Sequence, residues 1–402
     1  MGERLTVAFI GCGGFGRRFM PLFKAHPTVD KVYICDLIPE RAKECSEKYG
    51  LEIIESFEKA LEDKSINCII NFTQRHLHGD IVIRALKAGK HVYSAVPMAS
   101  TVEECQEIVK LVKEKDLIYL MGETCYYYPC AMYCREAYKE GKFGDFTYGA
   151  SQYYHHIDYI SYGKRPNEGG MPPLLYPTHS TGMILSAVDS YVEKVVCVGY
   201  EDKTNDGRFG EGCNQWDNKD ANQYVLMKLA NGGTARVTEA RNFGWFKPSS
   251  YISAVYGTKG GYEFSLAQHV MVEMDSTEPK EHAKLTDVSD YVNSYAMTEH
   301  KNDPDFLEKV ANNAWQNADL SPVQMKEVER LPKEFAELET GHMGTHKFLV
   351  DDFCKAVYEH KMPILNAWTS ARYTIPGLVA IESAKLGSVM LDVPDCGDAP
   401  EW

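Results

Sequence analysis

The sequence predicts an α/β protein with two domains, and three observations lead to that prediction. Apolar segments alternate with amphipathic segments over residues 1–125, which is typical of a doubly wound parallel sheet. From residue 126 the apolar segments are longer and carry polar residues at alternate positions, which favours a large, open, mainly antiparallel sheet. The length of 402 residues allows two cores. We therefore expect an N-terminal α/β domain over 1–125 and a C-terminal α+β domain over 126–402.

The N-terminal domain begins with the apolar segment LTVAFI at 5–10, which indicates a buried parallel strand. The glycine-rich turn GCGGFG follows at 11–16, and RRFMPLFKAH after it has the pattern of a helix. The later segments alternate in the same way. We expect strands at 29–36, 66–73, 91–96 and 117–123, and helices at 39–50, 56–63, 78–90 and 101–116.

The C-terminal domain contains six segments with the pattern of strands and a hairpin signal, NGG at 231–233. Residues 268–340 are polar, and we expect an insert with helices that acts as a lid or an oligomer contact. Two final helices, at 346–360 and 370–387, are expected to pack back on the body. The strands are expected at 146–156, 193–200, 222–231, 233–241, 250–258 and 261–266.

The charge balance excludes two classes of partner. The chain has 43 Lys and Arg residues against 57 Asp and Glu residues, with a formal net charge of −14. Nucleic acids and anionic membranes attract basic surfaces, so we expect neither as a partner. The first residues lack the pattern of a signal peptide, and no apolar run reaches the ~18 residues that span a bilayer. These observations predict a cytoplasmic protein.

The 12 cysteines do not form a recognisable framework. No CxxC pair is present, and the closest group, Cys125, Cys130 and Cys134, has spacings unlike those of zinc sites. We expect no metal. Reduced thiols used for packing are the simplest interpretation.

The turn GCGGFG has the spacing of a dinucleotide-binding loop, because it follows a strand, opens a helix and precedes an acidic residue at a strand end. Gly11 permits the tight turn, Gly13 lets the backbone approach a diphosphate, and Gly16 allows close helix packing. Asp36 is expected to accept hydrogen bonds from the adenosine ribose and to favour NAD over NADP. Arg41 is a counter-signal, since it could reach a 2′-phosphate. The alternative is that the glycines only form a turn.

Beyond this loop the sequence resembles the Gfo/Idh/MocA family of dinucleotide-dependent enzymes, which act mostly on sugars and polyols. The resemblance rests on GCGGFG, Asp36, FTQRHLHGD at 72–80 and AGKHVYSAVPMAS at 88–100. It implies an N-terminal Rossmann domain and a homo-oligomer, a dimer or tetramer, formed through the C-terminal sheet. It also implies a cofactor-binding set: Gly11, Gly13, Gly14, Phe15, Gly16, Asp36, Arg41, Thr73, His78, Ala95, Pro97 and Glu123.

The sequence departs from the usual dehydrogenases of that family at two catalytic positions. Ala95, Val96 and Pro97 stand where those enzymes carry Glu-Lys-Pro, so the lysine that helps to deprotonate an alcohol is absent. In LLYPTHSTG the usual aspartate is Leu175, and only His179 remains. Alcohol oxidation by the usual Lys/Asp/His set is therefore not available.

A smaller branch of the family, the NAD-dependent glycoside hydrolases typified by α-N-acetylgalactosaminidases, is similar at these positions. The similarity rests on YPTH at 176–179, ETC at 123–125, GHMG at 341–344 and the ending VPD with Trp402. It implies an NAD that stays bound and a redox-neutral cycle: oxidation at sugar carbon 3, loss of the carbon-2 proton, elimination, addition of water and reduction.

Two residues are the catalytic candidates under this resemblance. His179 would accept the proton of the carbon-3 hydroxyl, and Tyr176 would act as the base at carbon 2 or stabilise an enolate. The alternatives are a structural histidine that caps a helix and a tyrosine that packs in the core.

The substrate-binding candidates are less specific. Tyr153 and His155 share one face of a strand, which the resemblance favours as sugar-lining. Lys164 and Arg165 could hold a polar sugar substituent or could be solvated loop charges. The remaining candidates are Glu123, which could contact the nicotinamide ribose or stand at a helix N-terminus, and Tyr126, which could stack on a sugar or belong to the core.

Three functions follow from these patterns. The first is an NAD-dependent enzyme that cleaves a glycoside by transient oxidation at carbon 3. The second is a sugar or glycoside 3-dehydrogenase with net formation of NADH. The third is a family member that binds the cofactor without catalysis.

Overall fold

The computed structural model describes residues 2–157, 169–244, 248–264, 268–274, 283–294, 303–304, 320–338 and 340–401. Its contacts divide the chain into two compact units. The first unit comprises Met1–Thr124, Glu327–Thr374 and Cys396–Trp402, and the second comprises Cys125–Lys326 and Ile375–Asp395. Among the described residues, no helix is long and apolar enough to cross a membrane.

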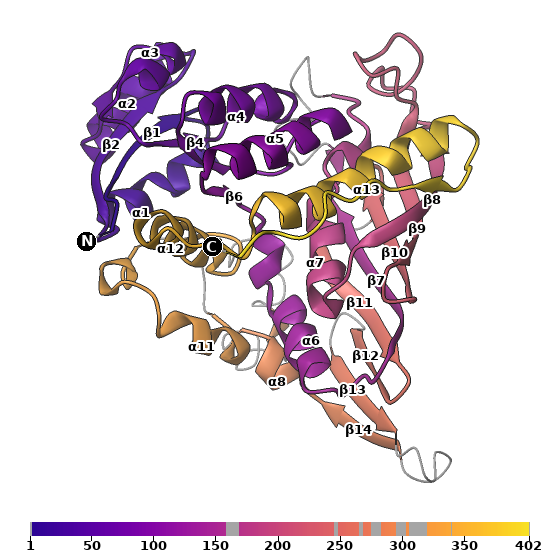
Figure 1. Cartoon of the computed structure of the whole chain (residues 1–402). Coiled ribbons are helices and arrows are strands. Elements are labelled where there is room, and N and C mark those ends of the chain that lie inside the picture. The colour runs from indigo at the N-terminus through magenta and orange to yellow at the C-terminus, as the bar shows by residue number, and fades with distance from the viewer. Residues whose placement is uncertain are drawn as a thin grey trace. The chain divides into compact units, whose positions relative to one another are not determined.

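The first unit is built on a parallel sheet of six strands within the described residues, in the order β3-β2-β1-β4-β5-β6. Figure 1 shows this sheet with α4 and α5 beside it. β1 lies between β2 and β4, so the strand order reverses at β1, and ligands of such sheets bind at the carboxyl ends of the strands there. The strands are β1 (Leu5–Ile10), β2 (Val29–Cys35), β3 (Glu52–Ile53), β4 (Cys68–Asn71), β5 (His91–Ser94) and β6 (Tyr119–Met121).

The helices between these strands follow the predicted segments with one difference. The segment after the glycine-rich turn is a 3-10 turn at Gly16–Arg18 and then a short helix, α1 (Met20–Ala25). Pro21 has no N–H to donate to the carbonyl one turn before it, so regular helical hydrogen bonding begins only there. The other helices are α2 (Pro39–Tyr49), α3 (Phe57–Glu62), α4 (His78–Lys87) and α5 (Val102–Lys115).

The first unit also contains a late segment of the chain, which the sequence placed in the C-terminal domain. Helix α12 (Thr345–Glu359) contacts β1 and α1. Its Phe353 is fully buried. The centroid of the Phe353 ring lies 6.1 Å from that of Phe23 and 5.8 Å from that of Tyr93. The apolar face of α12 therefore completes the core of the first unit. Helix α13 (Ala367–Lys385) is divided between the units at Thr374.

The second unit is built on a sheet of nine strands within the described residues, in the order β14-β13-β12-β11-β7-β10-β9-β8-β15. Only β7 and β10 among these pairs run parallel. β9 and β10 flank the NGG turn as an antiparallel hairpin, as predicted. The strands are β7 (Phe146–Tyr154), β8 (Val192–Glu201), β9 (Asp220–Leu229), β10 (Thr234–Ala240), β11 (Ser250–Gly257), β12 (Gly260–Phe264), β13 (His269–Met274), β14 (Ala283–Asp287) and β15 (Leu391–Asp392).

The polar stretch at 268–340 differs from the expected helical insert in its first part. β13 and β14 continue the sheet by antiparallel pairing from β12, before α8 (Ser289–Val292) and α11 (Met325–Val328). Alternating polar and apolar residues in a strand at a sheet edge leave one face solvated, which explains the polar composition.

Two longer helices cover one face of this sheet, α6 (Pro129–Lys139) and α7 (Thr178–Val188). α7 contacts β7, β10 and β11, and every one of its residues is buried. The α/β fold class predicted from the sequence, a parallel Rossmann sheet followed by a large, mostly antiparallel sheet, is confirmed.

Candidate functional site

The glycine-rich loop follows β1 directly, and its glycines have different reasons to lack a side chain. Gly11 has a φ of 102°, and a Cβ there would lie 2.6 Å from the Phe72 carbonyl oxygen. A Cβ on Gly16 would lie 2.9 Å from the Phe72 Cβ. At Gly13 and Gly14 a Cβ would meet nothing within 4 Å, and neither residue has a positive φ. The fold itself therefore requires glycine at two positions and leaves open space at the other two.

Asp36 directly follows β2 and is hydrogen-bonded to this loop. Its Oδ2 accepts a hydrogen bond from the Cys12 N–H at 2.7 Å, and its Oδ1 accepts one from the Ile38 N–H at 2.9 Å. Leu37 beside it is 97% exposed. Such an exposed apolar side chain, next to the carboxylate predicted to bind the ribose, would suit the face of a nucleobase. Arg41 lies exposed in α2.

Leu37 was not predicted as a site residue. The only signal in the sequence is an apolar residue directly after Asp36, and a leucine at that position is ordinary unless its exposure is known.

The carboxyl ends of β4 and β5 are linked by a chain of hydrogen bonds. The Thr73 hydroxyl donates to the Asn71 Oδ1 at 2.7 Å, and the Asn71 amide donates to the Ser94 hydroxyl at 3.1 Å. His78 is buried at the start of α4, with Nδ1 2.8 Å from the Pro97 carbonyl and Nε2 3.3 Å from the Thr73 carbonyl. His78 thus joins the two loops that hold Thr73, Ala95 and Pro97 at the sheet's ligand-binding edge.

Glu123 follows β6 at the same edge and is fully buried. A Cβ on Gly122 would lie 2.2 Å from the Tyr93 hydroxyl oxygen, so the phenol lies against the chain beside Glu123. Burial, followed by the charge of Glu123, raises the pKa of Tyr93 well above its usual value. Tyr93 is therefore kept neutral in the core of this unit.

These features fit a nicotinamide dinucleotide in the first unit. The open space over Gly13 and Gly14 would give a diphosphate access to backbone N–H groups. Asp36 stands where a ribose would be bound. If the glycines only formed a turn, nothing in the fold would explain why residues 13 and 14 are glycines.

The predicted catalytic pair lies in the second unit, where the two side chains are in contact. The Tyr176 hydroxyl and the His179 Nε2 are 2.9 Å apart. The Tyr153 ring packs on both, with centroid distances of 5.0 Å to His179 and 5.8 Å to Tyr176. All three side chains are buried. His179 is the second residue of α7. Its ring forms a hydrogen bond with Tyr176, which a histidine that only capped the helix would not need.

A buried charged network supports this pair. Arg241 donates to the Glu239 carboxylate at 2.9 Å and to the Pro173 carbonyl at 3.1 Å. Glu239 in turn accepts a hydrogen bond from the Ser180 hydroxyl. The Arg241 guanidinium also lies 4.9 Å from the centre of the Tyr153 ring. The network thereby connects the segment that carries Tyr176 and His179 to the end of β10.

Glu239 and Arg241 were not predicted as part of the site. The signal in the sequence is the pair of charged residues at the end of TARVTEAR, a segment that otherwise alternates as a half-buried strand. Charged residues are almost never fully buried unless they are paired, and that pairing becomes evident only from the structure.

The other substrate candidates lie in different settings. His155 follows β7, and its ring centroid is 5.6 Å from that of Tyr153, so the two are neighbours as predicted from the strand period. Tyr126 is buried, and the Arg135 guanidinium carbon lies 4.0 Å from the centre of its ring. Lys164 and Arg165 lie outside the described residues.

The cysteines considered for a metal site are buried thiols. Cys125, Cys130 and Cys134 are all buried, and burial raises the pKa of Cys130 to about 11. Burial also raises the pKa of Cys134 well above its usual value. Protonated thiols in such surroundings pack as small apolar groups.

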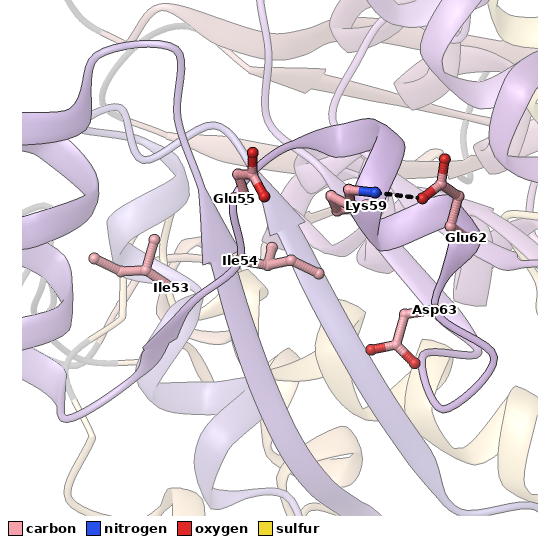
Figure 2. A pocket seen from close by; sticks show the side chains of 6 residues that line it. All are labelled: Ile53, Ile54, Glu55, Lys59, Glu62 and Asp63. Carbon is pink, nitrogen blue, oxygen red and sulfur yellow. Dashed lines mark hydrogen bonds and ion pairs between the residues drawn. The ribbon is translucent and has the colours of Figure 1, made fainter.

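A surface hollow at the β3 edge of the first unit contains none of the predicted site residues. It is lined by Ile53, Ile54, Glu55, Lys59, Glu62 and Asp63. In Figure 2, Lys59 extends toward Glu62, and their charged atoms are 2.8 Å apart. Lys59 and Glu62 are thus already engaged with each other.

Comparison with known proteins finds a family match within the first unit. The family described as "Oxidoreductase family, NAD-binding Rossmann fold", Gfo/Idh/MocA, matches residues 5–123. Residues 5–123 therefore resemble the NAD-binding Rossmann unit of the Gfo/Idh/MocA oxidoreductases. The family resemblance inferred from GCGGFG and Asp36 is confirmed, as is a Rossmann unit of the NAD-binding type.

Three proteins with similar sequences are named for three different activities. A glycosyl hydrolase family 109 protein of Saccharopolyspora erythraea is 22% identical over 98% of this chain and 83% of its own length. The 2,7-anhydro-N-acetylneuraminate hydratase of Escherichia coli is 22% identical over 66% of this chain and 68% of its own. The levoglucosan dehydrogenase of Pseudarthrobacter phenanthrenivorans is 25% identical over 65% of this chain and 74% of its own length.

The fold extends over the whole chain. A levoglucosan dehydrogenase solved with NADH and L-sorbose matches 98% of this chain and 100% of its own, with a TM-score of 0.72 and 19% identity. At this level of identity the match establishes the fold, and the reaction has to be argued from the residues of the site.

Proposed function

We propose that this protein is an NAD-dependent enzyme of the Gfo/Idh/MocA family that cleaves a glycosidic bond without net oxidation. The reaction begins by removal of hydride from carbon 3 of a glycoside and continues by elimination and addition of water. The net change is the conversion of glycoside and water to free sugar and alcohol, with the cofactor returned to its starting state.

The observation that carries the proposal is the hydrogen bond between Tyr176 and His179. The usual lysine and aspartate of the family's dehydrogenases are replaced by Val96 and Leu175, whereas Tyr176 and His179 form a polar pair at 2.9 Å. A tyrosine bonded to an imidazole can pass its proton to Nε2 as it accepts a proton from a substrate hydroxyl or an acidified C–H. The pair therefore supplies the base that the missing lysine would have provided.

The bound nicotinamide would supply an acceptor and then a donor of hydride. The chain's own contribution to the later steps is acid–base chemistry. Oxidation at carbon 3 acidifies the proton at carbon 2, and a base near neutrality can then remove it. A phenol can also stabilise the resulting enolate by donating a hydrogen bond to the enolate oxygen.

The relatives support a redox-neutral outcome in two ways. The relative whose alignment covers 98% of this chain is named as a glycosyl hydrolase. Another is named as a hydratase, and addition of water involves no net oxidation. We infer that NAD is the preferred cofactor, since the Asp36 carboxylate would repel a 2′-phosphate, and that it stays bound between turnovers.

The test uses purified enzyme with aryl glycosides and follows both the released aglycone and the absorbance of NADH. We expect aglycone release with no steady growth of NADH. Tyr176→Phe and His179→Gln should each lower kcat by about 100-fold or more, as expected for loss of a general acid–base group. Steady NADH formation with intact glycoside would overturn the proposal.

A second candidate, a sugar 3-dehydrogenase with net formation of NADH, is favoured by the levoglucosan dehydrogenase among the relatives. The same assay separates the two, because a dehydrogenase forms one NADH for each sugar oxidised. Tyr176→Phe would impair both activities, so the decision rests on the stoichiometry of NADH to free aglycone.

A further inference from the structure

The segment that leads into α12 has an unusual backbone. His342, Met343 and Gly344 have φ values of 49°, 58° and 84° in succession. A non-glycine residue in the left-handed region costs of the order of 1 kcal/mol or more, and such residues cluster at ligand sites. We refer to residues 341–344 as the GHMG turn. It belongs to the dinucleotide-binding unit.

The GHMG turn and α12 bring two histidines together. His342 Nδ1 and His346 Nε2 are 2.9 Å apart. His346 is fully buried, and burial, followed by the charges of His342 and Arg18, lowers its pKa well below the usual value. His346 is therefore a neutral partner that orients the half-exposed ring of His342.

The histidine pair lies against the glycine-rich loop and the turn after it. Phe15 of the loop places its ring edge-on to His342 at 5.4 Å, and Phe19 stacks on His346 at 4.1 Å. A Cβ on Gly341 would lie 3.0 Å from the Arg18 guanidinium, so Arg18 extends over the GHMG turn. Two basic side chains from distant parts of the sequence thus flank the predicted diphosphate-binding loop.

Within the described part of the chain, two buried polar atoms at the start of α12 have no hydrogen-bond partner. They are the Thr345 hydroxyl oxygen and the His346 Nδ1. Both residues are fully buried, and a buried polar atom without a partner costs about 1–3 kcal/mol. Unsatisfied atoms at the N-terminus of a 15-residue helix indicate a place where a bound polar group completes the hydrogen bonding.

We propose that Arg18 and His342 form a second, cationic wall of the dinucleotide site that binds the diphosphate of the cofactor. His346 positions His342 through the contact between its Nε2 and the His342 Nδ1. In a chain with a net charge of −14, a dianionic diphosphate needs local cations in addition to the backbone N–H groups of the loop. The wall explains why a family member would retain its cofactor through the whole cycle. The inference rests on the cofactor part of the proposed function, and it is independent of the substrate.

The test measures binding of NADH directly. The dissociation constant and the dissociation rate are followed by NADH fluorescence with wild type, Arg18→Gln and His342→Asn. Asparagine tolerates the left-handed backbone at 342, so the substitution removes the ring and leaves the turn. We expect each variant to weaken binding about tenfold, mainly through faster dissociation, which is about 1.4 kcal/mol.

Two matched variants control for effects of the substitutions that do not depend on the proposed wall. His360 has the same backbone conformation, with a φ of 50° at the other end of α12, and Arg4 is an exposed arginine of the same unit. His360→Asn and Arg4→Gln should leave the affinity for NADH unchanged. A thermal melt of each cofactor-free variant checks that the fold is intact.

The outcomes separate this inference from the proposed function. Unchanged NADH binding in Arg18→Gln and His342→Asn overturns the cationic wall, while the proposed reaction stands. Failure of the wild type to bind NADH overturns both. If His342→Asn unfolds, Arg18→Gln decides the question, together with the salt dependence of NADH binding, whose slope should fall when a phosphate contact is lost.

Discussion

At the scale of single residues, the candidate site depends on how buried charges are paired. Glu239 is fully buried, Arg241 is 1% exposed, and they bond to each other and to the chain around Tyr176. Removal of one member of such a pair leaves an uncompensated buried charge, which is costly, whereas removal of both is often tolerated.

This argument predicts the effect of Arg241→Met. The variant leaves the Glu239 carboxylate buried without its cation, so the free energy of unfolding should fall by about 3–5 kcal/mol. Urea denaturation measures it. The double variant Glu239→Gln/Arg241→Met should recover part of the loss, and a double variant no more stable than the single one would contradict the pairing argument.

The sequence allowed some of these residues to be predicted and not others. Tyr176 and His179 are three positions apart around a helix start, so a contact between them follows from local geometry. Glu239 and Arg241 bond to Ser180 and Pro173, which are more than 50 residues away in the chain. A local sequence pattern cannot predict contacts between residues so far apart. Leu37 could be named only once its exposure was known.

At the scale of elements, the glycine-rich loop separates the requirements of folding from those of binding. Gly11 and Gly14 differ in backbone conformation and in the room for a side chain, since only Gly11 has a positive φ and a close neighbour. A pair of alanine substitutions can therefore test the two roles separately.

Gly11→Ala should lower the free energy of unfolding by more than 1 kcal/mol, because its backbone is left-handed and its Cβ meets the Phe72 carbonyl. Gly14→Ala should leave the stability of the cofactor-free protein nearly unchanged and weaken NADH binding, because its methyl group would occupy the space kept open for the ligand. Denaturation of both variants and a fluorescence titration of Gly14→Ala measure this. Equal effects of the two substitutions on stability would contradict the assignment.

The β12–β13 hairpin gives the fold a dependence on pH. Burial lowers the pKa of His269 to about 4 from 6.5, opposed by the hydrogen bond to Asn293 and the charge of Asp287. Its Nδ1 lies 2.5 Å from the Tyr262 hydroxyl. The folded state keeps this histidine neutral, while the unfolded state protonates it below pH 6.5.

Stability should therefore fall as the pH drops from about 6.5 to about 4, by an amount on the order of 3 kcal/mol. Below pH 4 both states are protonated at this residue, and its contribution to the slope ends. Denaturation of wild type and His269→Gln over this pH range isolates the effect, because the variant should have the shallower dependence. Parallel curves would show that His269 is not responsible.

The elements themselves were predictable where their pattern is local. The alternation of strands and helices over 1–125 follows from short apolar runs, and the NGG hairpin follows from its turn residues. The break before α1 required knowledge of what Pro21 does to a helix start. The attachment of α12 to the first unit, and of β13 and β14 to the second sheet, depends on long-range packing that a local pattern does not encode.

At the scale of the whole molecule, the open face of the second sheet carries an apolar surface that predicts self-association. Val198 is 55% exposed and Leu226 is 49% exposed, and they stand on the adjacent strands β8 and β9 with the exposed Tyr200 and Tyr224. A cluster of this kind on a sheet face is typical of an interface. We propose that a second copy of the chain covers it, which matches the oligomer implied by the family resemblance.

Substitution of Leu226 tests this proposal. Leu226→Glu places a charge in the middle of the apolar face, where burial in an interface would be costly. We expect the wild type to sediment as a dimer or tetramer and the variant as a smaller species. Ile53→Glu, at a comparably exposed apolar residue of the first unit, should keep the wild-type mass. Since each copy carries a charge of −14, salt should strengthen association of the wild type by screening repulsion. An unchanged mass for Leu226→Glu would place the interface elsewhere.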